Sequence, residues 1–142
     1  MSGIAFNLPR VVTLTADLAL LGLAATHGYV LATTASPPGY FAVYCVAMIV
    51  GCLAAAATTW IDVDDVVPAL GWLAGTVSCG TFVIGYLVSR LVSLPGLPTV
   101  TGRWDLAPGS LALACAGGFL ALQLSVLSGV NVAFGQGRAW YD

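Results

Sequence analysis

Four long apolar runs, separated by short polar segments, dominate the pattern of this chain. They cover residues 11–33, 41–60, 66–94 and 107–134. A helix needs roughly 20 residues to cross a hydrocarbon core of about 30 Å, and each run is long enough. Lipid offers the backbone no hydrogen-bond partner, and four runs are too few to close a barrel. The pattern therefore predicts an all-α fold with four transmembrane helices.

The connections between these runs predict the topology. Residues 36–40 (SPPGY) contain turn-forming proline and glycine, and residues 61–68 (IDVDDVVP) contain three aspartates. Asp65 is a candidate N-cap for the third helix, and Pro68 falls in its first turn. Short connections make sequential helices antiparallel. We expect an up-down-up-down four-helix bundle that forms one membrane domain over residues 1–142.

The composition supports a membrane location. The chain has 142 residues, of which 59% are hydrophobic and 7% are charged. Soluble domains average about 25% charged residues, so this chain lacks the charge to cover a water-facing surface. No basic run is present, which argues against nucleic-acid binding. The arginines are divided equally between the two predicted sides of the membrane, so the positive-inside rule does not fix the orientation.

Arg90 is a basic residue near the end of the third apolar run. It lies 24 residues after Val66, about 36 Å along a helix that must cross a core of about 30 Å. Its long side chain can therefore reach the membrane interface. Asp105, beyond the following loop, is the predicted salt-bridge partner. We expect this pair to anchor the end of the third helix and to organise the loop 95–107.

Two ionisable residues, Asp17 and His27, interrupt the first run. Such residues inside a membrane are candidates for transport or ligand contact. The alternative for Asp17 is that it caps a late-starting helix, or pairs with Arg10 or Arg138. The alternative for His27 is a hydrogen-bonded core or interfacial residue. Because it is the single histidine, a haem with two histidine ligands from this chain is excluded.

Three sulfur residues of the second run share one helix face, because Cys45, Met48 and Cys52 are spaced at i, i+3 and i+7. Sulfur ligands suit Cu(I), and His27 could complete such a site. The alternative is that these side chains only pack. The chain has no CxxC motif, so a thiol redox centre is not expected. We predict no cofactor beyond bound lipid.

Small residues form stripes at helical spacing in the predicted spans. In the third run, Gly71, Gly75 and Cys79 follow one another at intervals of four, and the fourth run contains Gly109, Gly117 and Gly118 among several alanines. Small residues let helix backbones approach closely in a membrane. The stripes can serve packing within the bundle or docking against another subunit.

Three segments carry a resemblance to known proteins: HGYV (27–30), YLVSRLVSLPGLP (86–98) and LAPGSLALA (106–114). The matching residues are His27, Tyr29, Ser89, Arg90, Leu94, Pro95, Pro108 and Gly109. In these the chain resembles a group of four-helix integral membrane proteins of high-GC bacteria and halophilic archaea. The resemblance implies a helical bundle in a prokaryotic plasma membrane. It implies no activity.

Candidate functions follow from what the polar residues can do. The sequence contains no recognisable nucleophile–base pair, phosphate loop or multi-carboxylate site, so we do not expect an enzyme. Minimal loops and small-residue faces favour a structural or accessory subunit of a larger membrane complex, for example a bioenergetic one. The alternatives are a small-solute or ion transporter or channel, and a copper- or cofactor-binding membrane protein. Expected partners are membrane lipids and either other membrane subunits or further copies of the chain.

Overall fold

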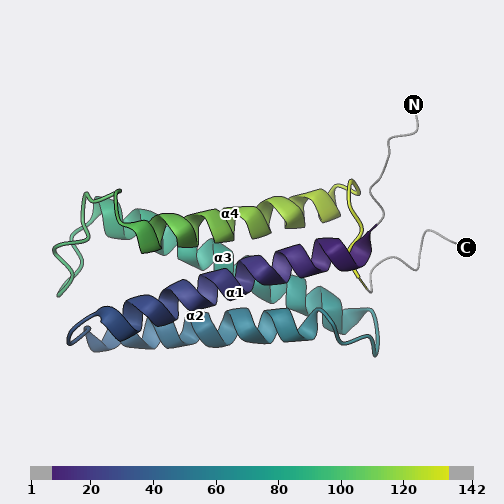
Figure 1. Ribbon diagram of the computed structural model, residues 1–142, viewed down its shortest axis with the longest axis horizontal. Coiled ribbons are helices and arrows are strands. Elements are labelled where there is room, and N and C mark those ends of the chain that lie inside the picture. Colours follow the sequence, from purple (N-terminus) through teal and green to yellow (C-terminus); the bar gives the residue numbers. More distant parts are fainter. Residues whose placement is uncertain (1–7, 135–142) are drawn as a thin grey trace, which may run out of the picture.

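The computed structural model describes residues 8–134, and this part of the chain folds into four α-helices. They are α1 (Pro9–Thr33), α2 (Gly39–Thr58), α3 (Val66–Leu91) and α4 (Ala107–Leu127). Each is long and apolar enough to cross a membrane. The helices contact one another in the cyclic order α1, α2, α3, α4, and consecutive helices run in opposite directions (Figure 1). This arrangement confirms the predicted up-down-up-down bundle.

The two ends of the bundle are formed by different helix termini and loops. At one end, on the right in Figure 1, α1 and α3 begin and α2 and α4 finish. We call this the Asp17 end. At the other end lie the short α1–α2 connection, residues 34–38, and the longer α3–α4 loop, residues 92–106. We call this the Arg90 end.

Proline and aspartate set where the helices begin. Pro9 and Pro108 occupy the first turns of α1 and α4, where a missing N–H removes no helical hydrogen bond. At the start of α3 the capping side chain is Asp64, not the predicted Asp65. Asp64 Oδ1 accepts hydrogen bonds from the N–H groups of Val66 and Val67, at 3.0 and 2.9 Å. The carboxylate also suits the positive end of the helix dipole.

Two helices end earlier than the apolar pattern predicts. α3 stops at Leu91 rather than at 94, because the Arg90 carbonyl accepts its hydrogen bond from Gly102 N–H (3.0 Å), which belongs to the returning loop. α4 stops at Leu127 rather than at 134. There Gly129 adopts a positive φ of 74°, the left-handed conformation that commonly terminates a helix. Apolar residues continue past both ends, so hydropathy alone overestimated the helix lengths.

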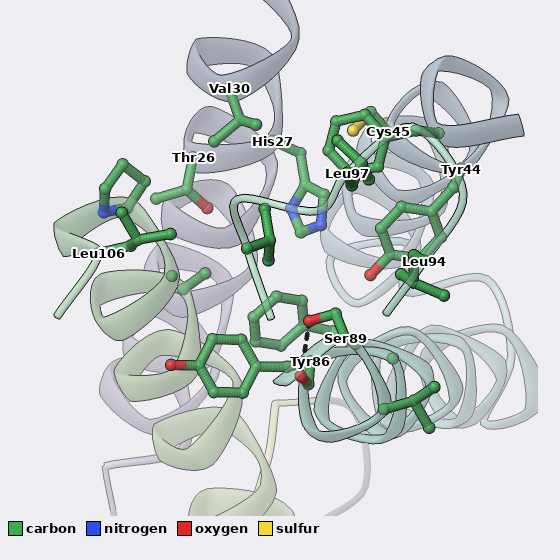
Figure 2. A pocket seen from close by; sticks show the side chains of 18 of the residues that line it. Thr26, His27, Val30, Tyr44, Cys45, Tyr86, Ser89, Leu94, Leu97 and Leu106 are labelled. Atoms are coloured by element: carbon green, nitrogen blue, oxygen red, sulfur yellow. Dashed lines mark hydrogen bonds between the residues drawn. The ribbon is translucent and has the colours of Figure 1, made fainter. Parts of the chain in front are cut away.

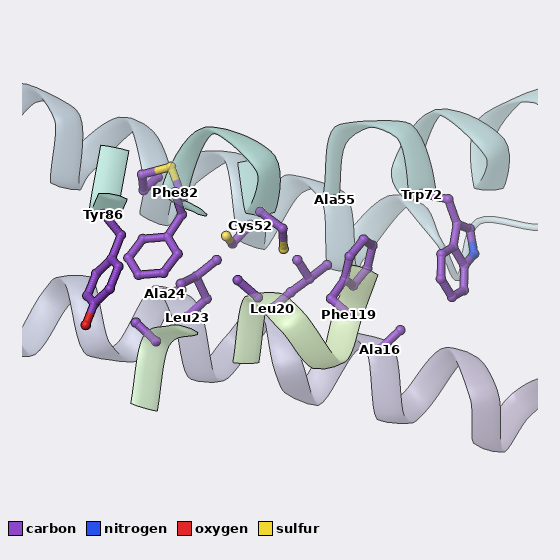
Figure 3. Close-up of a cluster of buried hydrophobic side chains, with 14 of the residues drawn as sticks. Ala16, Leu20, Leu23, Ala24, Cys52, Ala55, Trp72, Phe82, Tyr86 and Phe119 are labelled. Carbon is purple, nitrogen blue, oxygen red and sulfur yellow. The ribbon is translucent and has the colours of Figure 1, made fainter. Parts of the chain in front are cut away.

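The middle of the bundle is closely packed (Figure 3). Its buried side chains come from all four helices and include Leu20, Cys52, Trp72 and Phe119. The glycine stripe of α3 serves this packing. A Cβ built on Gly75 would meet the ring of Phe119, which itself stacks on Trp72 with ring centroids 5.4 Å apart. Small residues here allow close helix approach, as expected in a membrane.

Candidate functional site

A cavity of about 430 Å³ lies inside the bundle at its Arg90 end (Figure 2). All four helices and the α3–α4 loop contribute to its wall. We call it the Arg90 cavity. Its wall is predominantly apolar, and the loop side chains that close it are Leu94, Leu97 and Val100. The volume lies within the range of about 300–1,000 Å³ that is typical of small-molecule sites.

Small residues leave the space open at this end. Gly85 of α3 and Ala112 of α4 line the cavity, whereas Gly109, which also lines it, packs closely against Arg90 and Tyr86. A Cβ on Gly85 would have as its nearest neighbour the hydroxyl oxygen of Tyr44, at 3.7 Å, which is an ordinary contact distance. At Gly75, in the packed middle, the same atom would collide with Phe119. The cavity therefore begins where the helices no longer fill the space between them.

The loop 92–106 is fastened across the end of the bundle. Tyr40, in the first turn of α2, donates its hydroxyl hydrogen to the Pro95 carbonyl (2.5 Å). Gly96 has a positive φ of 78°, and a Cβ there would lie 2.7 Å from the Pro38 ring. Together with the hydrogen bond from Gly102 N–H to the Arg90 carbonyl, these contacts hold the loop as one wall of the cavity.

Arg90 belongs to this wall and is buried, with 5% of its surface exposed. Its Nη1 donates to the Val100 carbonyl (2.9 Å), and its guanidinium lies 4.5 Å from the centroid of the Tyr86 ring. Its Nε is buried and has no hydrogen-bond partner among the described residues. The predicted role of Arg90 in organising the loop agrees with these contacts. The loop folds back over the side chain, which the sequence did not indicate.

The predicted salt bridge between Arg90 and Asp105 is not formed. Asp105 instead pairs with Arg103, with 3.3 Å between Arg103 Nη2 and Asp105 Oδ2. The hydrogen bonds from Arg103 lower the pKa of the Asp105 carboxyl below its ordinary value. Both side chains are exposed. The sequence spacing favours this outcome, since Arg103 is only two residues from Asp105 while Arg90 is engaged by the loop backbone.

His27 points into the Arg90 cavity from α1 (Figure 2). Its Nδ1 lies 2.8 Å from the Leu23 carbonyl. A carbonyl oxygen can only accept, so Nδ1 carries a proton and, in the neutral ring, Nε2 is an acceptor. The ring also makes edge contacts with Tyr44 and Phe82, with centroids 5.5 and 5.4 Å away. His27 is thus both a hydrogen-bonded core residue and a cavity residue.

The sulfur residues of α2 face inward, and Cys45, Met48 and Cys52 are all buried. Cys45 lines the Arg90 cavity together with His27, whereas Cys52 belongs to the packed middle. Among residues 8–134, no three histidine, cysteine, aspartate or glutamate side chains converge as a metal site. The proposed copper site stays a prediction.

Asp17 lies at the opposite end and is also buried, with 5% of its surface exposed. Its two carboxyl oxygens lie 3.1 Å from the Thr59 hydroxyl, and Trp60 Nε1 donates to Oδ2. We call these three residues the Asp17 cluster. Asp17 is neither a helix cap nor, among the described residues, paired with a cation; Arg138 lies outside the described residues. Instead it fastens the end of α2 to α1.

The two polar regions do not form one site. Asp17 and His27 are ten residues apart on α1, about 15 Å along the axis. Leu20 and Leu23, both fully buried, lie between them in the packed middle. Within the described part of the chain, the residues suggested for transport are therefore divided: Asp17 belongs to the Asp17 cluster, whereas His27 and Arg90 line the Arg90 cavity.

The sequence did not predict most of the side chains that line the Arg90 cavity. Tyr44, Tyr86 and Val100 carry no local signal, because an aromatic or apolar residue in a membrane helix or loop is ordinary. The contact between Trp60 and Asp17 could not be predicted either, since a tryptophan at a helix end is typical of an interfacial aromatic belt. Comparison of the chain with protein-family models, curated proteins and solved structures yields no match.

Proposed function

We propose that this integral membrane protein binds a small lipophilic molecule in the Arg90 cavity. The observation that carries the proposal is an apolar cavity inside the bundle with a few polar groups directed at it. A concave, mostly apolar wall and a small number of convergent polar groups are the usual features of a small-molecule site. In the packed middle of the bundle, by contrast, the ring of Phe119 fills the space beside Gly75.

The polar groups of the cavity can hold a bound ligand in one orientation. His27 offers an acceptor at Nε2, the Tyr44 hydroxyl lies near the glycine wall, and Arg90 offers donors beside the loop. These groups lie on three different helices. A bound molecule with one polar group would therefore contact several helices at once and hold the Arg90 end together.

A cavity-filling substitution tests the proposal. In Gly85→Leu the new side chain enters the cavity, whereas in the control Gly80→Leu the same side chain on the same helix enters open space. Protein in a steroid-based detergent, which has no alkyl chain of its own, is titrated with dodecanol and followed by native mass spectrometry. We expect one dodecanol to bind to the wild type and to Gly80→Leu, and binding to be lost in Gly85→Leu.

The result that would overturn the proposal is equally direct. If dodecanol binds to all three proteins alike, it occupies the outer surface, and the cavity is not the site. If it binds to none of them while melting curves show that all three are folded, the cavity does not take up a lipophilic molecule. Thermal melting supplies a second readout, because a ligand that binds only the folded state raises the melting temperature.

An accessory role in a larger complex is a second candidate, favoured by the outer face of α4. Ala114, Gly117, Gly118 and Ala121 are exposed there, and a Cβ on either glycine would meet nothing within 4 Å. Such a face lets another helix approach closely. The partner that fits is a transmembrane helix of a different subunit with small side chains of its own, since α4 offers it no charged residue.

Native-size analysis after mild detergent extraction tests this second candidate. We expect a complex of defined stoichiometry with a second polypeptide, which Gly118→Leu disrupts and Gly80→Leu preserves. A monomer that binds only detergent would contradict the accessory role. A complex that contains only copies of this chain would contradict it as well, and would make α4 a homo-oligomer contact.

A further inference from the structure

Among residues 8–134, no carboxylate forms a salt bridge with the buried Arg90; its charge acts on Asp105 only at longer range, as a minor cause of the lowered pKa of that carboxyl. Arg90 is 5% exposed, and the contacts of its guanidinium among the described residues are a backbone carbonyl and an aromatic ring. The acidic residue of the adjoining loop, Asp105, is bound by Arg103 instead. A buried charge is costly unless it is paired and hydrogen-bonded. A cation in this position, in the wall of a cavity, therefore favours an anionic partner.

One edge of the guanidinium is left for that partner. Nη1 is used by the Val100 carbonyl, while Nε has no partner and no hydrogen bond joins Nη2 to the described residues. Nε and Nη2 form one of the two-donor edges with which arginine binds carboxylate or phosphate oxygens in a fork. Nε is enclosed, so binding of an anion at this edge requires a rotation of the Arg90 side chain toward the cavity.

The beginning of α4 adds a second positive feature at the same place. Its N-cap residue, Leu106, has no side chain that can accept from the first N–H groups of the helix. Gly109 lies in this first turn, and a Cβ on it would lie 2.9 Å from Arg90 Nη2. The guanidinium therefore sits against the positive end of a helix dipole. The guanidinium and the N-terminus of α4 are both positive, so an anion that binds to both would stabilise their contact.

The rest of the cavity suits the body of an amphiphile. Apart from Arg90 and a few polar groups such as those of His27 and Tyr44, the wall is apolar, with Phe82, Val30 and Leu97 among its side chains. A volume of about 430 Å³ lies in the lower part of the range for small-molecule sites, which favours a single alkyl chain over a lipid with two.

The geometry points to an anionic amphiphile as the ligand of the Arg90 cavity, with its carboxylate or phosphate oxygens at the Nε–Nη2 edge of Arg90 and one alkyl chain inside the bundle. This inference rests on the proposed function, since it concerns the same cavity. It adds the chemical class of the ligand and assigns Arg90 as the residue that selects it.

Three probes of equal chain length separate the head group from the chain: dodecanol, dodecanoate and dodecyl phosphate. Their dissociation constants are measured by native mass spectrometry in the steroid-based detergent. We expect the wild type to bind at least one of the anions about tenfold or more tightly than dodecanol, as a charged hydrogen bond implies. The tighter of the two anions identifies the head group as carboxylate or phosphate.

Two arginine variants locate the selectivity. Arg90→Gln should bind the anion and dodecanol with similar affinity, because the charged fork is gone. Arg103→Gln removes the same charge from the exposed neighbouring loop and should keep the preference. If Arg90→Gln does not fold, Arg90→Lys keeps the charge but lacks the fork. It should then bind the anion several-fold more weakly than the wild type while binding dodecanol unchanged.

The outcomes separate this inference from the proposal on which it rests. Equal binding of all three probes to the wild type, lost in Gly85→Leu, would overturn the anionic class while the lipophilic site stands. An anion preference that survives in Arg90→Gln and disappears in Arg103→Gln would overturn the assignment to Arg90. If no probe binds to the folded wild type, both proposals fail together.

Discussion

The two ends of this bundle each bury one ionisable residue, and they treat it differently. At the Asp17 end, the carboxyl group faces the Thr59 hydroxyl and the Trp60 indole. At the Arg90 end, the guanidinium has one backbone acceptor, one aromatic ring and an unpartnered Nε beside a cavity. Asp17 and Arg90 are equally buried, at 5% exposure each, so burial does not distinguish them.

The difference lies in whether the protein itself supplies the partners. A buried polar group whose partners come from neighbouring helices fixes how those helices pack. A buried polar group that has unused hydrogen-bond donors and lies beside a cavity is instead suited to bind a ligand. The Asp17 cluster is therefore interpreted as structural, and the Arg90 cavity as the site of the proposed ligand.

The largest expected difference between the ends concerns packing. A Cβ on Gly71, at the Asp17 end, would lie 2.9 Å from the Thr59 backbone nitrogen and 3.0 Å from the Ala55 carbonyl oxygen. We expect Gly71→Val to destabilise the fold by about 3 kcal/mol, because backbone atoms cannot move aside. Gly85→Val, at the Arg90 end, should cost less than about 0.5 kcal/mol. Thermal melting in detergent measures both, and equal losses would remove the packing contrast.

Removal of Asp17 should have the next largest effect. Asp17→Ala leaves the Trp60 indole N–H without its acceptor. It also removes the contact of the carboxyl group with Thr59, whose hydroxyl keeps its hydrogen bond to the Ala56 carbonyl at 2.7 Å. We expect this loss to cost about 2 kcal/mol. The control is Asp105→Ala, which removes an exposed carboxylate and should lower the melting temperature only slightly. Equal melting temperatures for the two variants would show that the Asp17 cluster does not hold α2 to α1.

Replacement of Arg90 should change stability less than replacement of Asp17. Arg90→Met loses one hydrogen bond to the Val100 carbonyl but also ends the burial of an unpaired charge. We expect the ligand-free protein to stay within about 1 kcal/mol of the wild type. A chemical or thermal melt without added amphiphile is the measurement. A loss as large as that of Asp17→Ala would mean that Arg90, like Asp17, is mainly structural.

The smallest effect is expected at the rim of the Arg90 end. Because Arg103 lowers the pKa of Asp105 in the folded state, the pair contributes stability above the ordinary aspartate pKa of about 3.9. That contribution is lost as the pH falls through the lowered folded pKa. The melting temperatures of the wild type and Asp105→Asn should differ slightly at neutral pH and converge in acid. Added salt should also reduce the difference, since an exposed pair is screened. A difference that grows on acidification would contradict this sign.

The hydropathy pattern was sufficient to predict the number, order and direction of the helices. This follows because runs such as 41–60 must span the lipid and short connections leave no choice of neighbour. The pattern was less reliable at helix ends. Both α3 and α4 stop at local backbone signals, the return of Gly102 to the Arg90 carbonyl and the left-handed Gly129, while apolar residues continue beyond them.

The position of Arg90 along α3 likewise separates what could be predicted from what could not. Its distance along α3 correctly places it near one end of the bundle, but distance along a helix says nothing of what covers that end. Only the tertiary structure shows the loop 92–106 folded back, with Val100 above the guanidinium and Arg103 in the place predicted for Arg90 beside Asp105.

The apolar runs and short connections were enough to predict a membrane bundle of four antiparallel helices, because crossing lipid requires long apolar runs. The tertiary structure alone decided that Asp17 meets Thr59 and Trp60, and that His27 and Arg90 share a cavity. The physical reason is that a helix in lipid is apolar on its outer as well as its inner face, so hydropathy does not identify the inward side. Which side chains meet is set by how each helix is rotated and how closely small residues let it approach.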